Sequence, residues 1–413
     1  MTTVATPLGE VKGVSEPGCE IFLGLRYARA TTGELRFRPP LPAEPWTDVF
    51  DATARGPVAP QIPRLESVLP QLDQQVSEDC LRLNVFTPAA DDRRRPVLVW
   101  VHGGSYVWGS ANSYDGRSFC REGDIVVVTL NYRLGLWGFV ELGHLDRELE
   151  GSHNNGIRDL IEGLRWVRAN IAAFGGDPDR VTLCGQSAGA GCVLALLASP
   201  AADGLYHRCI AQSPPARLGR PHSEDPDRLL AALGGESPAT LTDLRAADLD
   251  RLLEVEARLE NVPAPDRLRL HRSDRAGTRP VVDDITITAE PVEAIRRRGA
   301  DNVPLLIGTT LDEGTLFALG LPEVVTEADL LAALDEHTDH PGRVLDAFRR
   351  EHPGEDLRSI AVHILTDTLF RAPTLDVADA QTAGGASCHV YRFSWRSQGF
   401  DGLFGATHAL DIP

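Results

Sequence analysis

The pentapeptide Gly185-Gln186-Ser187-Ala188-Gly189 constrains the fold of this chain more than any other stretch. It follows a short apolar run typical of a buried strand, residues 181–184, and it precedes a helical pattern over residues 188–198. A serine in this position sits on a tight strand-to-helix turn, which its small neighbours allow to close. The pattern therefore predicts a nucleophile, Ser187, at the edge of an α/β sheet.

A second glycine-rich stretch, His102-Gly103-Gly104-Ser105, also follows a strand-like run, residues 96–101. Glycines let the backbone approach a substrate closely, and backbone N–H groups can stabilise a developing oxyanion. We expect the N–H groups of Gly104, Ser105 and Ala188 to form an oxyanion hole. His102 is expected to hold this loop rather than to transfer protons.

Strand-like runs alternate with helical patterns along much of the chain. Apolar residues at helical spacing predict a helix over residues 154–174, which ends at Gly175-Gly176-Asp177-Pro178. This alternation predicts an α/β fold with a mainly parallel central sheet and helices on both faces. The other expected strands lie within residues 9–29, 81–86, 125–132, 303–307 and 389–395.

Two segments, residues 217–279 and 326–377, are rich in Leu, Ala, Arg and acidic residues at helical spacing. We interpret both as helical insertions above the sheet that shape the substrate pocket. With 413 residues and no internal repeat, the chain is expected to form one large domain over residues 1–413.

Composition excludes several classes of partner. A formal net charge of −18 argues against binding to nucleic acid or to anionic membranes. No apolar run approaches the roughly 18 residues that would span a bilayer, and the N-terminus shows no secretory signal. Seven scattered cysteines without a CxxC pair predict reduced thiols and a cytoplasmic location. The oligomeric state stays open.

A serine nucleophile needs a histidine to take its proton and a carboxylate to support that histidine. In hydrolases of this architecture the acid and then the histidine follow the serine along the chain. Asp312 and Glu313 both follow the expected strand 303–307, and spacing alone does not separate them. His408 follows the last expected strand, whereas the rival bases His363 and His389 lie inside regular elements.

At these motifs the chain resembles the type-B carboxylesterases of the α/β-hydrolase fold, which include cholinesterases and bacterial para-nitrobenzyl esterases. The resemblance implies a triad of Ser187, Glu313 and His408, and oxyanion donors from Gly104, Ser105 and Ala188. The matching stretches are GLRYA (24–28), RFRPP (36–40), SEDCLRLNV (77–85), PVLVWVHGGS (96–105), NYRLGLWGF (131–139), FGGDPDRVTLCGQSAGA (174–190), GTTLDEG (308–314) and GATHALDIP (405–413).

The resemblance implies a serine carboxylic-ester hydrolase that works through an acyl-enzyme without metal or organic cofactor. Its substrates are expected to be small to medium apolar esters. The alternatives are an aryl carbamate or amide hydrolase with the same triad, a catalytically silent binding protein, or a truncated remnant. Glu78 and Arg133 lie inside family motifs and are expected to form structural ion pairs.

The departures from the family pattern are specific. Cholinesterases carry a glutamate where Gln186 stands, and the loop 60–76 lacks the aromatic residue of their choline site, so a choline ester is not expected. Cys80, which forms a disulfide in secreted relatives, is expected to be free. Ser213 is followed by proline where the family usually has glycine. Relatives continue well beyond the base, so we expect the C-terminal part of the fold to be missing and His408 to be loosely held.

Overall fold

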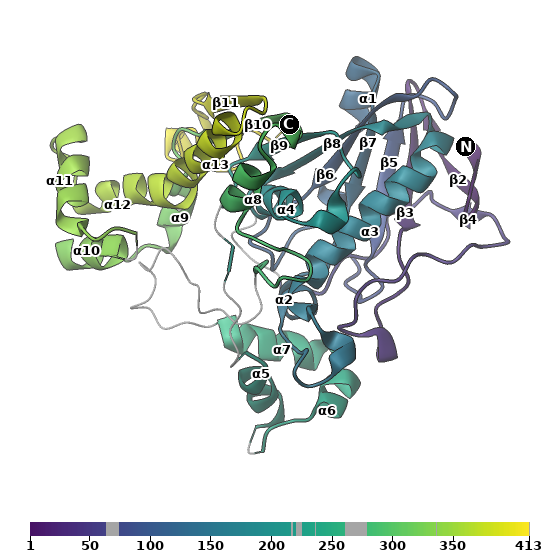
Figure 1. Ribbon diagram of the computed structural model, residues 1–413, viewed down its shortest axis with the longest axis horizontal. Coiled ribbons are helices and arrows are strands. Elements are labelled where there is room, and N and C mark those ends of the chain that lie inside the picture. The colour runs from purple at the N-terminus through teal and green to yellow at the C-terminus, as the bar shows by residue number, and fades with distance from the viewer. Residues whose placement is uncertain are drawn as a thin grey trace.

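A large sheet runs through the centre of the protein (Figure 1). The computed structural model describes residues 1–62, 74–215, 218–219, 225–235, 237–260, 279–335 and 337–412. The described residues form an 11-stranded sheet in the order β1-β2-β3-β5-β7-β6-β8-β9-β10-β11, and β4 pairs with β2. The strands are β1 (Thr2–Thr6), β2 (Gly9–Glu16), β3 (Cys19–Arg26), β4 (Phe50–Asp51), β5 (Arg82–Thr87), β6 (Arg95–Val101), β7 (Val126–Leu130), β8 (Gly176–Gln186), β9 (Arg208–Gln212), β10 (Leu305–Thr310) and β11 (Cys388–Phe393).

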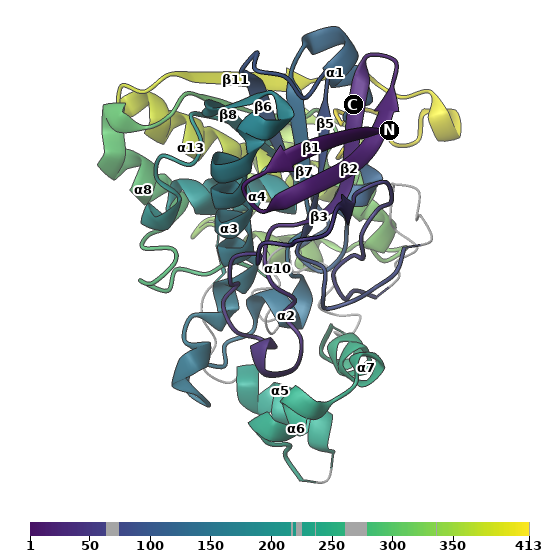
Figure 2. The ribbon, with the colours of Figure 1, turned by 90° about the vertical axis from the view of Figure 1, so that its right-hand side faces the viewer.

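The sheet has two parts that differ in strand direction. From β7 through β6, β8, β9 and β10 to β11, neighbouring strands run parallel. On the other side, β1, β2, β3, β5 and β7 pair in antiparallel fashion, which Figure 2 shows from the N-terminal edge. The parallel part places the carboxyl ends of its strands along one edge, where ligands gather in such sheets.

Helices surround this sheet. They are α1 (Arg117–Gly123), α2 (Gly135–Phe139), α3 (Asn155–Asn170), α4 (Ala188–Leu197), α5 (Asp225–Gly234), α6 (Leu241–Ala246), α7 (Leu249–Glu260), α8 (Pro291–Arg298), α9 (Gly314–Phe317), α10 (Glu327–Asp335), α11 (Pro341–Glu351), α12 (Leu357–Thr366) and α13 (Ala372–Ala383). No helix in the described ranges is long and apolar enough to cross a membrane.

The central strands β5 and β7 are buried on both faces of the sheet, and successive side chains along a strand point to opposite faces. Phe22 and Val85 belong to the main core, which also includes residues of α3 and α4. Their sequence neighbours Ile21 and Phe86 pack with Cys120 of α1 in a separate cluster. The predicted α/β fold with helices on both faces is therefore confirmed.

The helical segments outside the sheet occupy two places (Figure 1). α5, α6 and α7 form one group, and their apolar residues pack with Trp137 of α2. α10, α11 and α12 form a second group with an apolar cluster of its own. Of the first expected insertion, residues 217, 220–224, 236 and 261–278 lie outside the described residues, as do residue 336 of the second insertion and residues 63–73 of the loop 60–76.

Most expected elements near the motifs are present. The helix expected over 154–174 is α3 followed by a 3₁₀ turn at Ile171–Phe174, and the strand expected at 181–184 is the end of the longer β8. β9 was not expected, because its sequence RCIAQ mixes charged, polar and apolar residues. This strand lies between β8 and β10. It therefore sets the distance between the Ser187 turn, which follows β8, and Glu313, which follows β10.

Candidate active site

Ser187 occupies a strained backbone position between β8 and α4, with φ 56° and ψ −127°. The glycines on either side are required by close packing. A Cβ atom at Gly185 would lie 2.5 Å from the Gly189 carbonyl carbon, and one at Gly189 would lie 2.1 Å from the Val101 carbonyl oxygen. The turn predicted from the pentapeptide thus forms because glycine alone fits beside the serine.

The glycine-rich loop after β6 lies next to this turn because of sheet register. Val101 pairs with Gly185, so the residues that follow the two strands meet at the same edge. Gly104 has φ 114°, and a Cβ there would lie 1.9 Å from the Trp108 carbonyl oxygen. Within the described residues, the N–H groups of Gly104, Ser105 and Ala188 donate no backbone hydrogen bond.

His102 is fixed beneath this loop. Its ring stacks on Tyr132 with centroids 4.6 Å apart, and its Nδ1 lies 2.8 Å from the Gly103 carbonyl oxygen. Burial lowers the pKa of His102 to about 4, although the Gly103 carbonyl opposes this effect. A neutral, buried ring in these contacts supports the loop, as the sequence suggested.

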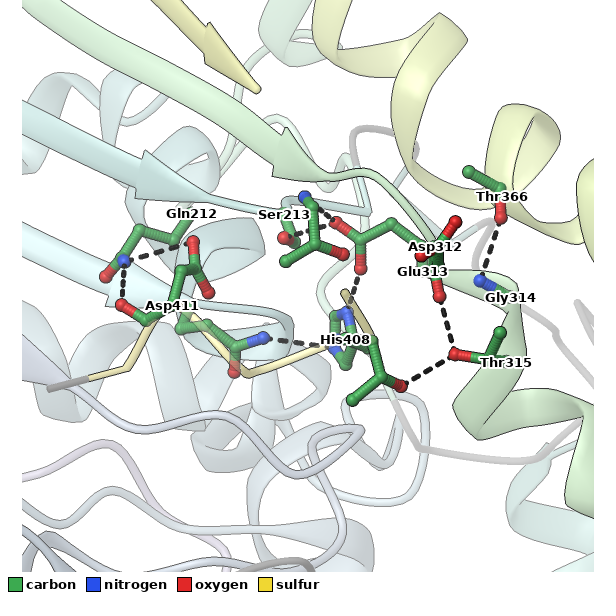
Figure 3. Close-up of polar contacts among 12 residues, drawn as sticks. Gln212, Ser213, Asp312, Glu313, Gly314, Thr315, Thr366, His408 and Asp411 are labelled. Carbon is green, nitrogen blue, oxygen red and sulfur yellow. Dashed lines mark hydrogen bonds and ion pairs between the residues drawn. The ribbon is translucent and has the colours of Figure 1, made fainter. Parts of the chain in front are cut away.

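Glu313 lies where β10 ends, next to the end of β9. Its Oε1 accepts hydrogen bonds from Ser213 Oγ at 2.6 Å and from the Thr310 N–H at 2.7 Å. Its Oε2 accepts from Nδ1 of His408 (Figure 3). Burial alone would raise the pKa of Glu313, but the neighbouring imidazole and these hydrogen bonds outweigh burial and lower it.

The adjacent carboxylate, Asp312, has different partners. Its Oδ2 accepts from the Ala406 N–H at 2.9 Å and lies 3.3 Å from Nε of Arg396. Of the two rival histidines, His363 contacts Glu355 on the outer helical group, and His389 is exposed on β11. The structure therefore brings Glu313 to His408 and leaves the other candidates elsewhere.

Side chains anchor the segment that carries His408. Asp411 Oδ2 accepts from Gln212 Nε2 at 3.2 Å (Figure 3). It also accepts from Tyr391 Oη at 2.6 Å. Thr407 pairs with Asp312 in an isolated β-bridge, and its hydroxyl lies 2.9 Å from Thr315 Oγ1. These bonds hold the base in place, so the expectation of a loosely held histidine is wrong.

Two aromatic rings cover the imidazole of His408. The ring centroid of Phe370 lies 4.6 Å away and that of Phe317 lies 5.3 Å away. Phe370 belongs to a π-helical turn, Asp367–Arg371, between α12 and α13. Such turns are rare and often occur at functional sites. Here the turn directs Phe370 onto the imidazole ring.

The Nε2 atom of His408 faces a residue that sequence reasoning gave no role in catalysis. Gln186 Nε2 lies 3.1 Å from it, and Gln186 is only 3% exposed. Among the described residues, no hydrogen bond joins Ser187 Oγ to His408. Sequence reasoning also gave Ser213 no role, although its hydroxyl donates a hydrogen bond to Glu313. The only sequence signal at this point was the proline that follows Ser213.

The remaining expected contacts are structural. Glu78 pairs with Arg36 at 2.7 Å and accepts from Trp137 Nε1, while Arg133 forms a buried pair with Asp159 at 2.7 Å. Cys80 is free and buried.

One group in the described ranges offers metal-ligating atoms close together: His352, Glu355 and His363. The two imidazole rings stack with centroids 3.6 Å apart and planes within 9°. Lone pairs lie in the ring planes, so two parallel rings do not direct them at one ion. These residues therefore do not present a metal-binding geometry as they stand.

Comparison with known proteins identifies the family. The sequence model of the Carboxylesterase family matches residues 1–413. The chain belongs to the carboxylesterase family. It is 38% identical to the para-nitrobenzyl esterase of Bacillus subtilis over 99% of this chain and 82% of that protein. It is 32% identical to carboxylesterase 1D of Rattus norvegicus over 94% of this chain and 73% of that protein.

Solved structures of carboxylesterases have the same fold. A para-nitrobenzyl esterase structure superposes with a TM-score of 0.86 at 37% identity, covering 100% of this chain and 82% of that one. A carboxylesterase of Geobacillus stearothermophilus gives 0.84 at 35% identity, covering 100% and 83%. This carboxylesterase is thus a serine carboxylic-ester hydrolase of the α/β-hydrolase fold. The expected loss of the C-terminal part of the fold is not borne out, because the family match extends to residue 413.

Proposed function

We propose that Ser187, His408 and Glu313 carry out ester hydrolysis in this carboxylesterase, and that its substrates are small to medium apolar esters. Ser187 Oγ attacks the ester carbonyl carbon while His408 Nε2 takes its proton. The N–H groups of Gly104, Ser105 and Ala188 stabilise the negative charge that develops on the carbonyl oxygen.

The tetrahedral intermediate then collapses. The C–O bond to the alcohol breaks, and the imidazolium of His408 returns the proton to the departing alkoxide. Water repeats the sequence on the acyl-enzyme and releases the acid. Glu313 orients the imidazole through Nδ1 and stabilises its charged form.

The observation that carries this proposal is the contact between Glu313 Oε2 and His408 Nδ1 at the edge where β8 and β10 end. A buried, ionised carboxylate on one ring nitrogen fixes the tautomer and leaves the other nitrogen unprotonated, so that it can act as a base. The same edge carries the strained serine and the N–H groups of Gly104, Ser105 and Ala188.

The apolar surroundings of the base support apolar substrates. Phe317 and Phe370 cover the imidazole, and both lie in or beside the second helical segment that we assign to the substrate pocket. The amide of Gln186 carries no charge to attract a cationic substrate. We further propose that residues 1–413 form one domain with the two helical insertions.

We also propose a reducing compartment, such as the cytoplasm, as the site of action. All seven cysteines are free, and Cys388 is the only one of them that is not buried. When freshly isolated protein is unfolded without a reducing agent, titration should count seven free thiols per chain. A disulfide in protein isolated under alkylating conditions would contradict this assignment.

A second candidate activity is the hydrolysis of aryl carbamates or amides by the same triad. One relative is a phenmedipham hydrolase of Pseudarthrobacter oxydans, 35% identical over 99% of this chain and 81% of that protein. Phenmedipham and a para-nitrobenzyl ester, tested beside simple esters, would rank the two activities by kcat/KM.

The decisive test compares para-nitrophenyl butyrate hydrolysis by the parent, Ser187→Ala and Ser15→Ala. Loss of the nucleophile should reduce kcat/KM by about 10⁴-fold or more. Ser15 is exposed on β2, so its replacement should leave the rate unchanged. A Ser187→Ala variant that keeps the parental rate would contradict the proposed function.

A further inference from the structure

The two nitrogens of the His408 ring have different partners. Nδ1 contacts Glu313, and Nε2 lies 3.1 Å from the side-chain nitrogen of Gln186. Ser187, although next in sequence to Gln186, makes no described hydrogen bond to the ring. The base is therefore engaged on both sides before any substrate arrives.

The chemistry of these groups fixes which atoms donate. A carboxylate only accepts, so Nδ1 carries the ring proton and donates to Glu313. Nε2 of the neutral ring then has a lone pair, and the amide group that faces it must be the NH₂ donor. This single lone pair is the one that must accept the hydrogen of the Ser187 hydroxyl during attack.

The backbone leaves Gln186 little freedom to move away. It is the last residue of β8, where it pairs in register with Gln212 of β9, and its side chain is buried. Its amide oxygen lies toward the oxyanion loop, because a Cβ atom at Gly103 would come within 3.1 Å of it. The amide thus lies between the loop that stabilises the oxyanion and the base that takes the proton.

We propose that Gln186 is a positioning residue that holds His408 in the neutral resting state and competes with Ser187 for Nε2. This inference rests on the function proposed above. A hydrogen bond donated to the neutral ring disfavours the imidazolium, because a protonated Nε2 has no lone pair for the amide to bond. A carboxylate at position 186 would do the opposite, since it would accept from the imidazolium and favour it.

Other charged groups near the base have partners of their own. Among the residues that the structure describes, Glu313 is the charged one that contacts the ring. Those on flanking segments are engaged elsewhere: Asp312 with Arg396 and the Ala406 N–H, Asp411 with Tyr391 and Gln212, and Arg371 with Asp367 and the Leu311 carbonyl. A change at position 186 therefore acts on His408 directly.

The first experiment measures kcat/KM for para-nitrophenyl butyrate against pH for the parent, Gln186→Glu and Gln186→Met. The carboxylate should move the midpoint of the acidic limb to higher pH by about one unit or more. The near-isosteric methionine should move it upward by a fraction of a unit, while the rate on the alkaline plateau is kept or increased because the competing donor is gone.

Gln381→Met is the matched control, because Gln381 is an equally buried glutamine whose amide bonds the Val303 and Ser387 carbonyls instead of the ring. Its midpoint should equal that of the parent. If each Gln186 variant changes kcat/KM by one constant factor at every pH and keeps the parental midpoint, Gln186 has only a structural role and the inference is overturned. Ser187→Ala that retains full activity would instead overturn the proposed function.

A second measurement does not depend on catalysis. In ¹⁵N-histidine-labelled protein, with His408→Gln used for assignment, Nε2 of the resting enzyme should show the shift of a hydrogen-bonded, unprotonated nitrogen. Gln186→Met should move this resonance, and Ser187→Ala should leave it in place. The reverse pattern would show that the serine, and not the glutamine, occupies the lone pair.

Discussion

The turn around Ser187 and the segment around His408 meet at one edge of the sheet, but they are held there by different means. Backbone packing fixes the turn: Gly185 and Gly189 admit no side chain against their neighbours. Side-chain hydrogen bonds fix the segment, through Asp312, Tyr391 and Gln212. One half of the site is therefore specified locally and the other by distant residues.

This difference predicts how each half responds to change. Removing a hydrogen bond to the His408 segment should weaken catalysis and leave the fold intact, because other bonds remain. Adding a methyl group to the turn should damage the fold itself, since backbone atoms of β6 and α4 would have to separate.

The largest expected effect on activity comes from Glu313→Gln. An amide cannot favour the imidazolium, and it can hold the ring in the wrong tautomer, so kcat should fall by roughly 10³–10⁴-fold. Asp312→Asn is the matched control, because this neighbouring carboxylate bonds Ala406 and Arg396. Equal losses in the two variants, measured with para-nitrophenyl butyrate, would contradict the assignment of the acid.

The contrast also explains what the sequence could reveal. The turn was predictable in full, because glycine spacing around a serine encodes a steric requirement. Glu313 and Asp312 could not be separated by spacing, since both follow β10 and only the fold shows which one meets the ring. Gln186 was visible only as a departure from the cholinesterase pattern, and its contact with His408 joins residues 222 positions apart.

Gly189→Ala should affect stability more than any surface substitution. Its Cβ would lie 2.1 Å from the Val101 carbonyl oxygen, so β6 and α4 must shift, at a cost of about 3 kcal/mol or more. Gly320→Ala provides the control, because nothing lies within 4 Å of its Cβ position. Thermal unfolding should separate the two variants, and equal midpoints would show that packing does not fix the turn.

A smaller effect, on the stability of the folded protein, should appear at acidic pH. The folded-state pKa of Glu313 is lowered: its burial opposes this shift, but the contacts with His408, Ser213 and the Thr310 N–H prevail. Its charge therefore contributes stability above the unfolded-state pKa of about 4.3, and this contribution is lost as pH falls through the lower folded-state value.

We expect hydrogen exchange in residues 405–411 to accelerate below about pH 4, after correction for intrinsic rates, while residues 185–191 keep their protection. Glu313→Gln should remove this pH dependence. If residues 405–411 and 185–191 lose protection together in the parent, the two segments open as one unit. The turn is then not held independently of the His408 segment.

The central claim is that the Ser187 turn and the His408 segment together form one acyl-transfer site. Peptide mapping by mass spectrometry, after reaction with a para-nitrophenyl alkylphosphonate, tests this claim most directly. We predict one adduct per chain, on Ser187, formed far more slowly in Glu313→Gln than in the parent. An adduct on another residue, or an active protein that gains no adduct, would contradict the account.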